Sequence, residues 1–288
     1  MEAVSRTVIV TGAGQGLGRA HALALGQAGF QVVVNDLKGA SAVADEIVAA
    51  GGVAVASAAD VADWSAAEGL VATAVETFGG LDALVNNAGI VRDRMLVGMA
   101  EADWDDVLRV DLKGHFCPLR HAAEYWRSLH KAGKPAQARV VNTSSGAGLM
   151  GSVGQGNYAA AKAGVVALTQ VAAVEMARYG ITVNALAPSA RTPMTESVFA
   201  ATMAKPESGF DPMDPANVSP LVVWLAGTSS GFVTGRVFEV EADRIGLCDG
   251  WRFGPRSEIG RAWRVDEIGP AVQELLAKAE PPTPVYGA

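Results

Sequence analysis

The chain contains little cysteine and no long apolar run, and both absences narrow the class of protein. Its 288 residues include two cysteines, Cys117 and Cys248, which lie far apart and belong to no CxxC pair. This spacing excludes a disulfide framework. The longest apolar runs, such as 221–225, are far shorter than the ~20 residues of a membrane-spanning helix, so no membrane partner is expected. The first residues enter an apolar strand without a basic signal region, which predicts a cytoplasmic protein.

Basic residues are scarce as well. Lys and Arg number 23 against 30 Asp and Glu, which gives a net charge of −7. Binding to nucleic acid depends on clustered basic residues, so no nucleic-acid partner is expected. His115, Cys117 and His121 are close in sequence, but no fourth ligand accompanies them. We expect these three to pack in an apolar helix, and we expect no metal site.

The order of short β-branched runs and longer alanine-rich stretches indicates the fold class. Hydrophobic residues make up 50% of the chain, which is enough for a sizeable core. The alternation predicts a single Rossmann-like, doubly wound α/β domain, with a seven-stranded parallel sheet and helices on both faces. The strands are expected at 7–10, 31–35, 53–57, 81–85, 139–143, 181–186 and 236–240.

The pattern changes near the end of the chain. We expect the domain to span 1–245 and a C-terminal extension, 246–288, to pack on the same domain or on a neighbouring subunit. Segment 191–217 follows the sixth strand and is expected to be a substrate lid, or else a helix packed on a neighbouring subunit. Its apolar side chains favour a hydrophobic substrate; they are Met194, Val198, Phe199, Met203, Phe210 and Met213.

Three residues carry the predicted chemistry. Tyr158 and Lys162 are four residues apart, so on a helix the ammonium lies beside the phenol. A positive charge favours phenolate and is expected to lower the tyrosine pKa, which enables proton exchange at physiological pH. A serine hydroxyl at Ser145 can hold the oxygen on which the proton lands. The set predicts interconversion of an alcohol and a ketone, for which a hydride carrier is still required.

A glycine-rich turn supplies the site for that carrier. The first strand runs directly into TGAGQGLG and an alanine-rich helix, where backbone N–H groups can approach a pyrophosphate. The strict GxGxxG spacing is not met, because Leu17 occupies the third glycine position. Asp36 ends the second strand and can bind ribose hydroxyls while repelling a 2′-phosphate, which favours NAD over NADP. The candidate cofactor-binding residues here are Gly12, Gly14, Gln15, Gly16, Leu17, Gly18, Asp36 and Leu37.

These motifs together resemble the short-chain dehydrogenase/reductase family. The series comprises TGAGQGLG, NNAG, SSGAGLMGSVGQGNYAAAK and ITVNALAP, and it covers the chain to about residue 245. The resemblance implies that Lys162 and Tyr158 also bind the nicotinamide ribose and that Ser145, rather than Ser144, is the catalytic serine. It further implies cofactor contacts from Asp60, Val61, Asn87, Ala88, Gly89, Pro188 and Thr192.

One catalytic position departs from the family pattern. Asp111 stands where the common pattern has an asparagine that helps to hold a water behind the lysine. If that role uses the backbone carbonyl, Asp111 preserves it; if it uses the side-chain amide, the relay must change. A carboxylate near Lys162 would also alter its charge balance. Asp111 is therefore a candidate catalytic residue whose role the sequence leaves open.

Further stretches resemble one branch of the family. GHFCPLRHAAEYWR, ARTPMTE and FEVEADRIGLCDGWR are similar to the (3R)-hydroxyacyl-CoA dehydrogenase unit of multifunctional β-oxidation enzymes and to bacterial hydroxysteroid dehydrogenases. The branch implies a 3-hydroxyacyl-CoA or a sterol-derived alcohol as substrate. A 17-hydroxysteroid dehydrogenase, a 3-oxoacyl thioester reductase and a catalytically silent NAD-binding sensor remain alternatives. By the same resemblance we expect a homo-oligomer, a dimer or tetramer.

Overall fold

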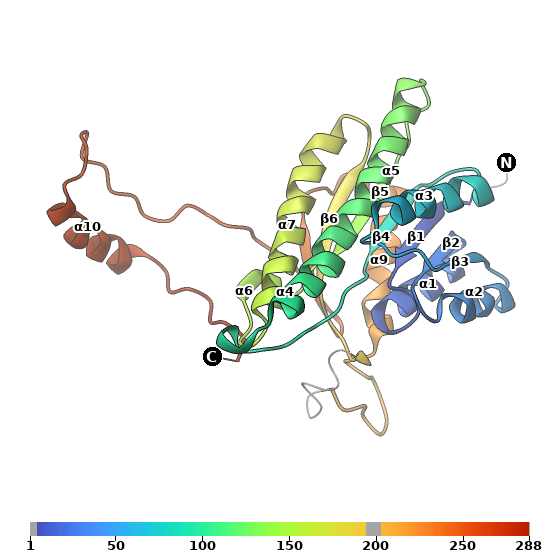
Figure 1. Ribbon diagram of the computed structural model, residues 1–288, viewed down its shortest axis with the longest axis horizontal. Helices are drawn as coiled ribbons and strands as arrows, with labels where there is room; N and C mark the ends of the chain where they lie inside the picture. The colour runs from blue at the N-terminus through green and yellow to red at the C-terminus, as the bar shows by residue number, and fades with distance from the viewer. Residues whose placement is uncertain (1–4, 194–202, 288) are drawn as a thin grey trace.

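The fold is an α/β sandwich built around one sheet (Figure 1). The computed structural model describes residues 5–193 and 203–287, so three predicted lid residues, Met194, Val198 and Phe199, lie outside the described part. The sheet has the strand order β3-β2-β1-β4-β5-β6-β7-β8. The strands are β1 (Thr7–Thr11), β2 (Gln31–Asn35), β3 (Val53–Ser57), β4 (Ala83–Asn86), β5 (Arg139–Thr143), β6 (Thr182–Ser189), β7 (Val237–Glu241) and β8 (Arg244–Cys248).

The predicted fold class is confirmed, but the predicted strand count is wrong by one. Each neighbouring pair from β3 to β7 is parallel, and β8 pairs antiparallel with β7. The two-residue turn before β8 places Ala242 at φ 54. Such hairpin turns usually carry Asn or Gly, because these residues adopt positive φ easily. The sequence Glu241-Ala242-Asp243 has neither, so the eighth strand has no hairpin signal.

Helices cover both faces of the sheet because the inner strands are apolar on both sides. In β1, Val8 and Val10 belong to the core beneath α1, α2 and α9, whereas Ile9 belongs to the core beneath α3, α5 and α7. The helices are α1 (Gly16–Gln27), α2 (Ala40–Ala49), α3 (Trp64–Phe78), η1 (Leu96–Gly98), α4 (Glu101–Val107), η2 (Leu108–Lys113, a π-helical turn), α5 (Gly114–Lys131), α6 (Gly146–Met150), α7 (Gly156–Ala177), η3 (Pro215–Asn217), α9 (Ser219–Ala226), η4 (Thr228–Ser230) and α10 (Val265–Lys278).

The strand order creates a crevice at the carboxyl edge of the sheet. The chain leaves β1 toward β2 and β3 on one side, and it later returns to place β4 on the other side of β1. In open α/β sheets a ligand binds where the strand order reverses in this way. The segments that follow β1, β4, β5 and β6 therefore meet at one edge. They carry the glycine loop, NNAG, Ser145 and Thr192.

Helix α7 is the longest helix in the described residues, and it is apolar. Among the described residues it is the one helix whose length and composition would allow it to cross a membrane, a test that the core helix of a soluble protein also passes. It contacts η2, α6 and β6 within the domain. It also carries Tyr158 and Lys162 on the turns nearest the crevice. Because of these contacts, α7 belongs to the packed α/β domain.

The end of the chain forms a long arm (Figure 1). Strand β8 runs across residue 245, where the sequence predicts the end of the domain. After β8 the chain extends away from the sheet, and none of the residues of α10 is buried. The last residues then return to the neighbourhood of α6 (Figure 1). There Tyr286 forms a parallel bridge with Ser152.

Candidate active site

A cavity of about 750 Å³ occupies the carboxyl edge of the sheet. Its walls bring together the glycine loop, the ends of β2, β4, β5 and β6, and the first turns of α7. Most residues proposed from the sequence line it, whereas Gly14, Gly18 and Asp111 do not. Those that line it are Gly12, Gln15, Gly16, Leu17, Asp36, Leu37, Asp60, Val61, Asn87, Ala88, Gly89, Ser145, Tyr158, Lys162, Pro188 and Thr192.

The glycine loop is packed too closely for side chains. A Cβ added to Gly14 would lie 2.0 Å from the carbonyl oxygen of Lys38, and one added to Gly18 would lie 2.1 Å from that of Gly12. Gly16 has φ 54 and begins α1. Its backbone can therefore face a pyrophosphate at the helix N-terminus without a side chain between them. These features fit a dinucleotide cofactor.

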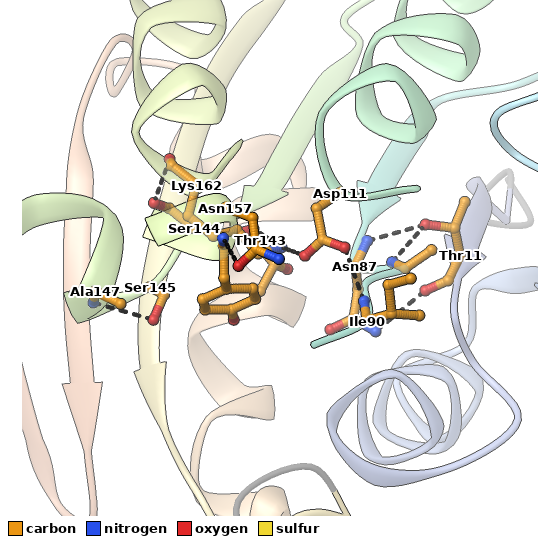
Figure 2. A network of polar contacts seen from close by, with 12 residues as sticks. Thr11, Asn87, Ile90, Asp111, Thr143, Ser144, Ser145, Ala147, Asn157 and Lys162 are labelled. Carbon is orange, nitrogen blue, oxygen red and sulfur yellow. Dashed lines mark hydrogen bonds and ion pairs between the residues drawn. The ribbon is translucent and has the colours of Figure 1, made fainter. Parts of the chain in front are cut away.

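The NNAG segment holds this loop in place. The backbone N–H groups of Asn87 and Ala88 donate to the Thr11 hydroxyl at 2.9 and 3.1 Å. The amide of Asn87 also donates to the carbonyl oxygen of Thr11 at 3.2 Å (Figure 2). It donates to the carbonyl oxygen of Gly12 at 3.2 Å as well. Asn87 thus ties β4 to the end of β1 as well as lining the cavity. Thr11 was not singled out in the sequence, although it precedes the first loop glycine directly.

Two carboxylates stand at the predicted adenosine end of the cavity. Asp36 accepts hydrogen bonds from the backbone N–H groups of Gly14 at 2.9 Å and Lys38 at 3.0 Å. Each carboxylate oxygen retains a lone pair for a ribose hydroxyl. Asp60 forms a 2.9 Å ion pair with Arg109. Burial raises the pKa of Asp60, but hydrogen bonds from Arg109 and the Ala62 backbone outweigh it, so the pKa is lowered.

The two adjacent serines point to different partners. Ser144 is buried and donates its hydroxyl to the carbonyl oxygen of Lys162 at 2.9 Å, which ties β5 to α7. Ser145 caps α6, and its oxygen accepts the Ala147 N–H at 3.2 Å (Figure 2). The Ser145 proton remains available for a donated hydrogen bond. Ser145 lines the cavity with Tyr158, and its hydroxyl acts to lower the pKa of that phenol.

Lys162 is held between a carbonyl and a carboxylate. Its Nζ donates to the carbonyl oxygen of Thr143 at 3.0 Å and lies 3.2 Å from Asp111 Oδ2 (Figure 2). The other Asp111 oxygen accepts the Ile90 N–H at 2.8 Å. Both charged side chains are almost completely buried, at 3% and 0% exposed. The residue that departs from the family pattern is therefore a direct partner of the proposed catalytic lysine.

Tyr158 lies above this pair on α7. Lys162 Nζ is 5.5 Å from the centre of its ring. Burial raises the pKa of Tyr158 above its ordinary value; Lys162 and Ser145 act downward, and Asp111 and Asp93 act upward. Lys162 lowers the pKa of Tyr158, as the sequence predicts, but burial outweighs this effect and the pKa is raised overall. Burial likewise raises the pKa of Asp111 against the opposing influence of Lys162.

The cavity also includes residues that the sequence did not single out. Tyr286 and Gly287 reach it from the chain end, and Gln155 lies three residues before Tyr158. Gln155 could have been noticed from its place on the same motif, but no periodicity or motif marks the chain end. Of the predicted lid residues, Met203 and Met213 line the cavity, whereas Phe210 is 59% exposed.

His115, Cys117 and His121 do not line the cavity. All three side chains are buried. His121 packs against the Trp64 ring at 4.5 Å between centroids. Among the described residues, no group of three His, Cys, Asp or Glu side chains is placed to hold a metal ion.

Comparison with known proteins extends these observations. The hydroxyacyl-CoA dehydrogenase ChsB1 of Mycobacterium tuberculosis is 45% identical over 286 residues, which are 96% of this chain and 90% of that protein. The peroxisomal multifunctional enzyme type 2 of Mus musculus is 42% identical over 252 residues, which are 84% of this chain but 32% of that longer enzyme. A crystal structure of a short chain dehydrogenase from Mycobacterium avium is 59% identical, covers 99% of both chains and has a TM-score of 0.92.

The family profile described as short chain dehydrogenase matches residues 6–202. This range includes the glycine loop, NNAG and the Ser145, Tyr158 and Lys162 set. The resemblance seen in the sequence is therefore confirmed. The chain belongs to the short chain dehydrogenase family and is an oxidoreductase that acts on CH–OH groups with a nicotinamide dinucleotide.

Proposed function

We propose that this chain is an NAD-dependent dehydrogenase that converts a 3-hydroxyacyl-CoA to the corresponding 3-oxoacyl-CoA. The observation that carries the proposal is that one continuous cavity joins the glycine loop and Asp36 to the Ser145 and Tyr158 hydroxyls. The similarity to a hydroxyacyl-CoA dehydrogenase across 96% of the chain supports the substrate class. The (3R) branch resemblance favours the R alcohol.

In the proposed reaction the Ser145 hydroxyl donates a hydrogen bond to the substrate oxygen. Tyr158 takes the proton of that alcohol during oxidation and returns it to the ketone oxygen during reduction. Lys162, fixed by Thr143 and Asp111, keeps a positive charge near the phenol. Bound NAD supplies the hydride acceptor. The raised pKa of Tyr158 favours the protonated phenol, so reduction is favoured at lower pH and oxidation at higher pH.

NAD is proposed over NADP because of the charges around the cavity. Asp36 is negative and faces the position of the adenosine ribose. Among the described residues that line the cavity, the basic side chains are Arg109 and Lys162. They are paired with Asp60 and Asp111. A 2′-phosphate would therefore meet Asp36 without an unpaired cation to balance it.

The remaining walls suit a substrate with an apolar part. Met203 and Met213 lie on the segment proposed as a lid, and Arg191 holds that segment. Arg191 donates to the Met203 carbonyl oxygen at 2.8 Å and pairs with Asp211. Flexible methionine side chains adapt to an acyl chain. This supports a lid that closes over lipid-like substrates.

The test is a spectroscopic assay of cofactor reduction with purified enzyme. Wild type is offered (3R)- and (3S)-hydroxyacyl-CoA esters and 17-hydroxysteroids, each with NAD or NADP. We expect turnover of the R thioester with NAD. Turnover of the steroid alone would contradict the substrate class, and a higher kcat/KM for NADP would contradict the role of Asp36. Assays of 3-oxoacyl thioester reduction with NADH and with NADPH test the reductase alternative.

A variant assay tests the acid/base residue. Tyr158→Phe keeps the ring but removes the proton-exchanging group, so we expect a fall in kcat of about 10²–10⁴-fold with unchanged NADH affinity. Affinity is read by titration of NADH fluorescence. Wild-type turnover in this variant would contradict the role of Tyr158.

We also propose that the enzyme is cytoplasmic and acts as a homo-oligomer. Exposed apolar residues on α7 support an association between copies, since Val171 is 55% and Val174 80% exposed. The subunit mass is 29.6 kDa. Light scattering is expected to return a multiple of this mass, and a single species of 29.6 kDa would contradict the oligomer.

A further inference from the structure

The end of the chain is hydrogen-bonded to the segment between the catalytic serine and tyrosine. The Val153 N–H donates to the Tyr286 carbonyl oxygen at 2.9 Å, and the Tyr286 N–H donates to the Gly151 carbonyl oxygen at 3.3 Å. Ser152 and Tyr286 form a parallel bridge. Tyr286 thus pairs with a loop of the active site, although the residues from 249 to 284 separate it from β8 along the chain.

The Tyr286 side chain reaches the cavity beside the catalytic serine. A Cβ added to Gly146 would lie 2.7 Å from the Tyr286 Oη and 2.9 Å from its Cε2. Gly146 directly follows Ser145, and both residues line the cavity with Tyr286. Glycine at 146 therefore makes room for the Tyr286 ring one residue from the group that holds the substrate oxygen.

The chemistry around Tyr286 indicates which part of a substrate it meets. Glu239 and Glu241 of β7 line the same cavity. Burial, followed by these two carboxylates, raises the pKa of Tyr286, so its phenol stays neutral. Carboxylates repel the phosphates of CoA, whereas a neutral phenol offers an apolar face and a hydrogen bond. Tyr286 remains 44% exposed, which leaves surface for contact.

We propose that segment 285–287 forms a wall of the substrate site and that Tyr286 positions the uncharged acyl and thioester part of the substrate against Ser145. Tyr286 acts through the placement of the substrate and not in the proton transfer. The proposal rests on the proposed function and adds a specificity-determining residue to it. Close packing against the loop supports this wall. A Cβ added to Gly151 would lie 3.4 Å from Val285, and one added to Gly287 would lie 3.6 Å from Val153.

Kinetics of four variants test the positioning role. Tyr286→Ala and a chain that ends after Pro284 should raise KM for the acyl substrate about tenfold, with a smaller change in kcat and none in the KM for NAD. Tyr286→Phe keeps the ring and should restore most of the affinity. Thr283→Ala, at an exposed position just before this segment and outside the cavity, is the matched control. Equal KM values in all four variants and wild type would overturn the proposal.

Hydrogen exchange tests the docking itself and does not require activity. The Val153 amide should exchange slowly in wild type and faster in the shortened chain, because its acceptor is the Tyr286 carbonyl. Fast exchange of the Val153 amide in both proteins would overturn the proposal that segment 285–287 forms a wall of the substrate site. If wild type oxidises no 3-hydroxyacyl-CoA, the proposed function fails while the exchange result still stands. The KM comparison is then made with the alcohol that wild type does oxidise, and an unchanged KM again overturns the role of Tyr286.

Discussion

At the scale of single residues, the main departure from the family pattern is a buried ion pair. Asp111 and Lys162 are 3.2 Å apart and shielded from solvent. A buried pair gains little net stability, because desolvation offsets the attraction, yet removing one partner is costly. Gly89 is constrained by the pair, since a Cβ there would lie 2.8 Å from Asp111 Oδ2 and 3.3 Å from Lys162 Nζ. We therefore propose that Asp111 acts as a positioning residue for Lys162.

Asp111→Asn removes the negative charge at this position but keeps a side chain that can form hydrogen bonds. Asparagine can still accept the Ile90 N–H, and Lys162 keeps Thr143. Because the Asp111 charge raises the pKa of Tyr158, its loss lowers that pKa. The acidic limb of the pH profile for alcohol oxidation should move down by on the order of one pH unit. We expect a stability loss of about 1–3 kcal/mol in denaturant unfolding.

The pH profile of kcat/KM distinguishes this role from simple packing. A structural role alone would lower stability and activity without moving the limb. Asp111→Leu removes charge and hydrogen bonds together and should be more destabilised than Asp111→Asn. An unchanged limb in Asp111→Asn would contradict the electrostatic link to Tyr158.

At the scale of elements, the cofactor site depends on close approach of backbone segments. Gly18 lies in the first turn of α1 against the Gly12 carbonyl oxygen. Gly69 lies inside α3, and a Cβ there would meet nothing within 4 Å. The two glycines are both helical, but only Gly18 is bounded by backbone that cannot move aside. They form a matched pair for the same substitution.

Gly18→Ala should displace the loop and weaken NADH binding by at least about tenfold, since 1.4 kcal/mol of strain suffices for that change. Gly69→Ala should leave binding unchanged and stabilise the fold by about 0.5–1 kcal/mol, because alanine favours the helix. Fluorescence titration and denaturant unfolding measure the two quantities. Equal NADH affinities in the two variants would contradict the packing argument.

Elements with a strong local signal were predictable from the sequence. Seven strands were expected within a few residues of their observed bounds because β-branched runs stand between turn residues. β8 was missed because Ala242 occupies a turn position that usually carries Asn or Gly. The sequence does not predict the contacts of Tyr286 with Gly146 and Ser152, because they join distant parts of the chain. The pKa of Tyr158 is raised because the phenol is buried, and burial cannot be read from the four-residue spacing to Lys162.

At the scale of the whole molecule, buried histidines couple stability to pH. His21 of α1 is fully buried, and its Nδ1 lies 2.9 Å from the Ser219 hydroxyl of α9. Burial lowers the pKa of His21 to about 3. His115 is also buried, and burial followed by the Lys162 charge lowers its pKa well below the ordinary value. Both imidazoles therefore remain neutral in the folded chain at mildly acidic pH.

The sign of the pH dependence follows from these lowered pKa values. An unfolded histidine binds a proton near pH ~6.5, so between this pH and the folded pKa the unfolded chain holds more protons. The free energy of unfolding must then fall as the pH falls. Between pH ~7 and ~5 this effect at His21 lowers the free energy of unfolding by about 2 kcal/mol. His21→Gln keeps a hydrogen-bonding side chain near Ser219 and removes the titrating group. The free energy of unfolding that this variant loses over this pH range should therefore be about 2 kcal/mol smaller than the loss in wild type.

Denaturant unfolding at the two pH values measures this loss, with the exposed His130→Gln as a control for the removal of an imidazole. An identical loss in His21→Gln and wild type would mean that the helix contact between α1 and α9 does not exclude the proton.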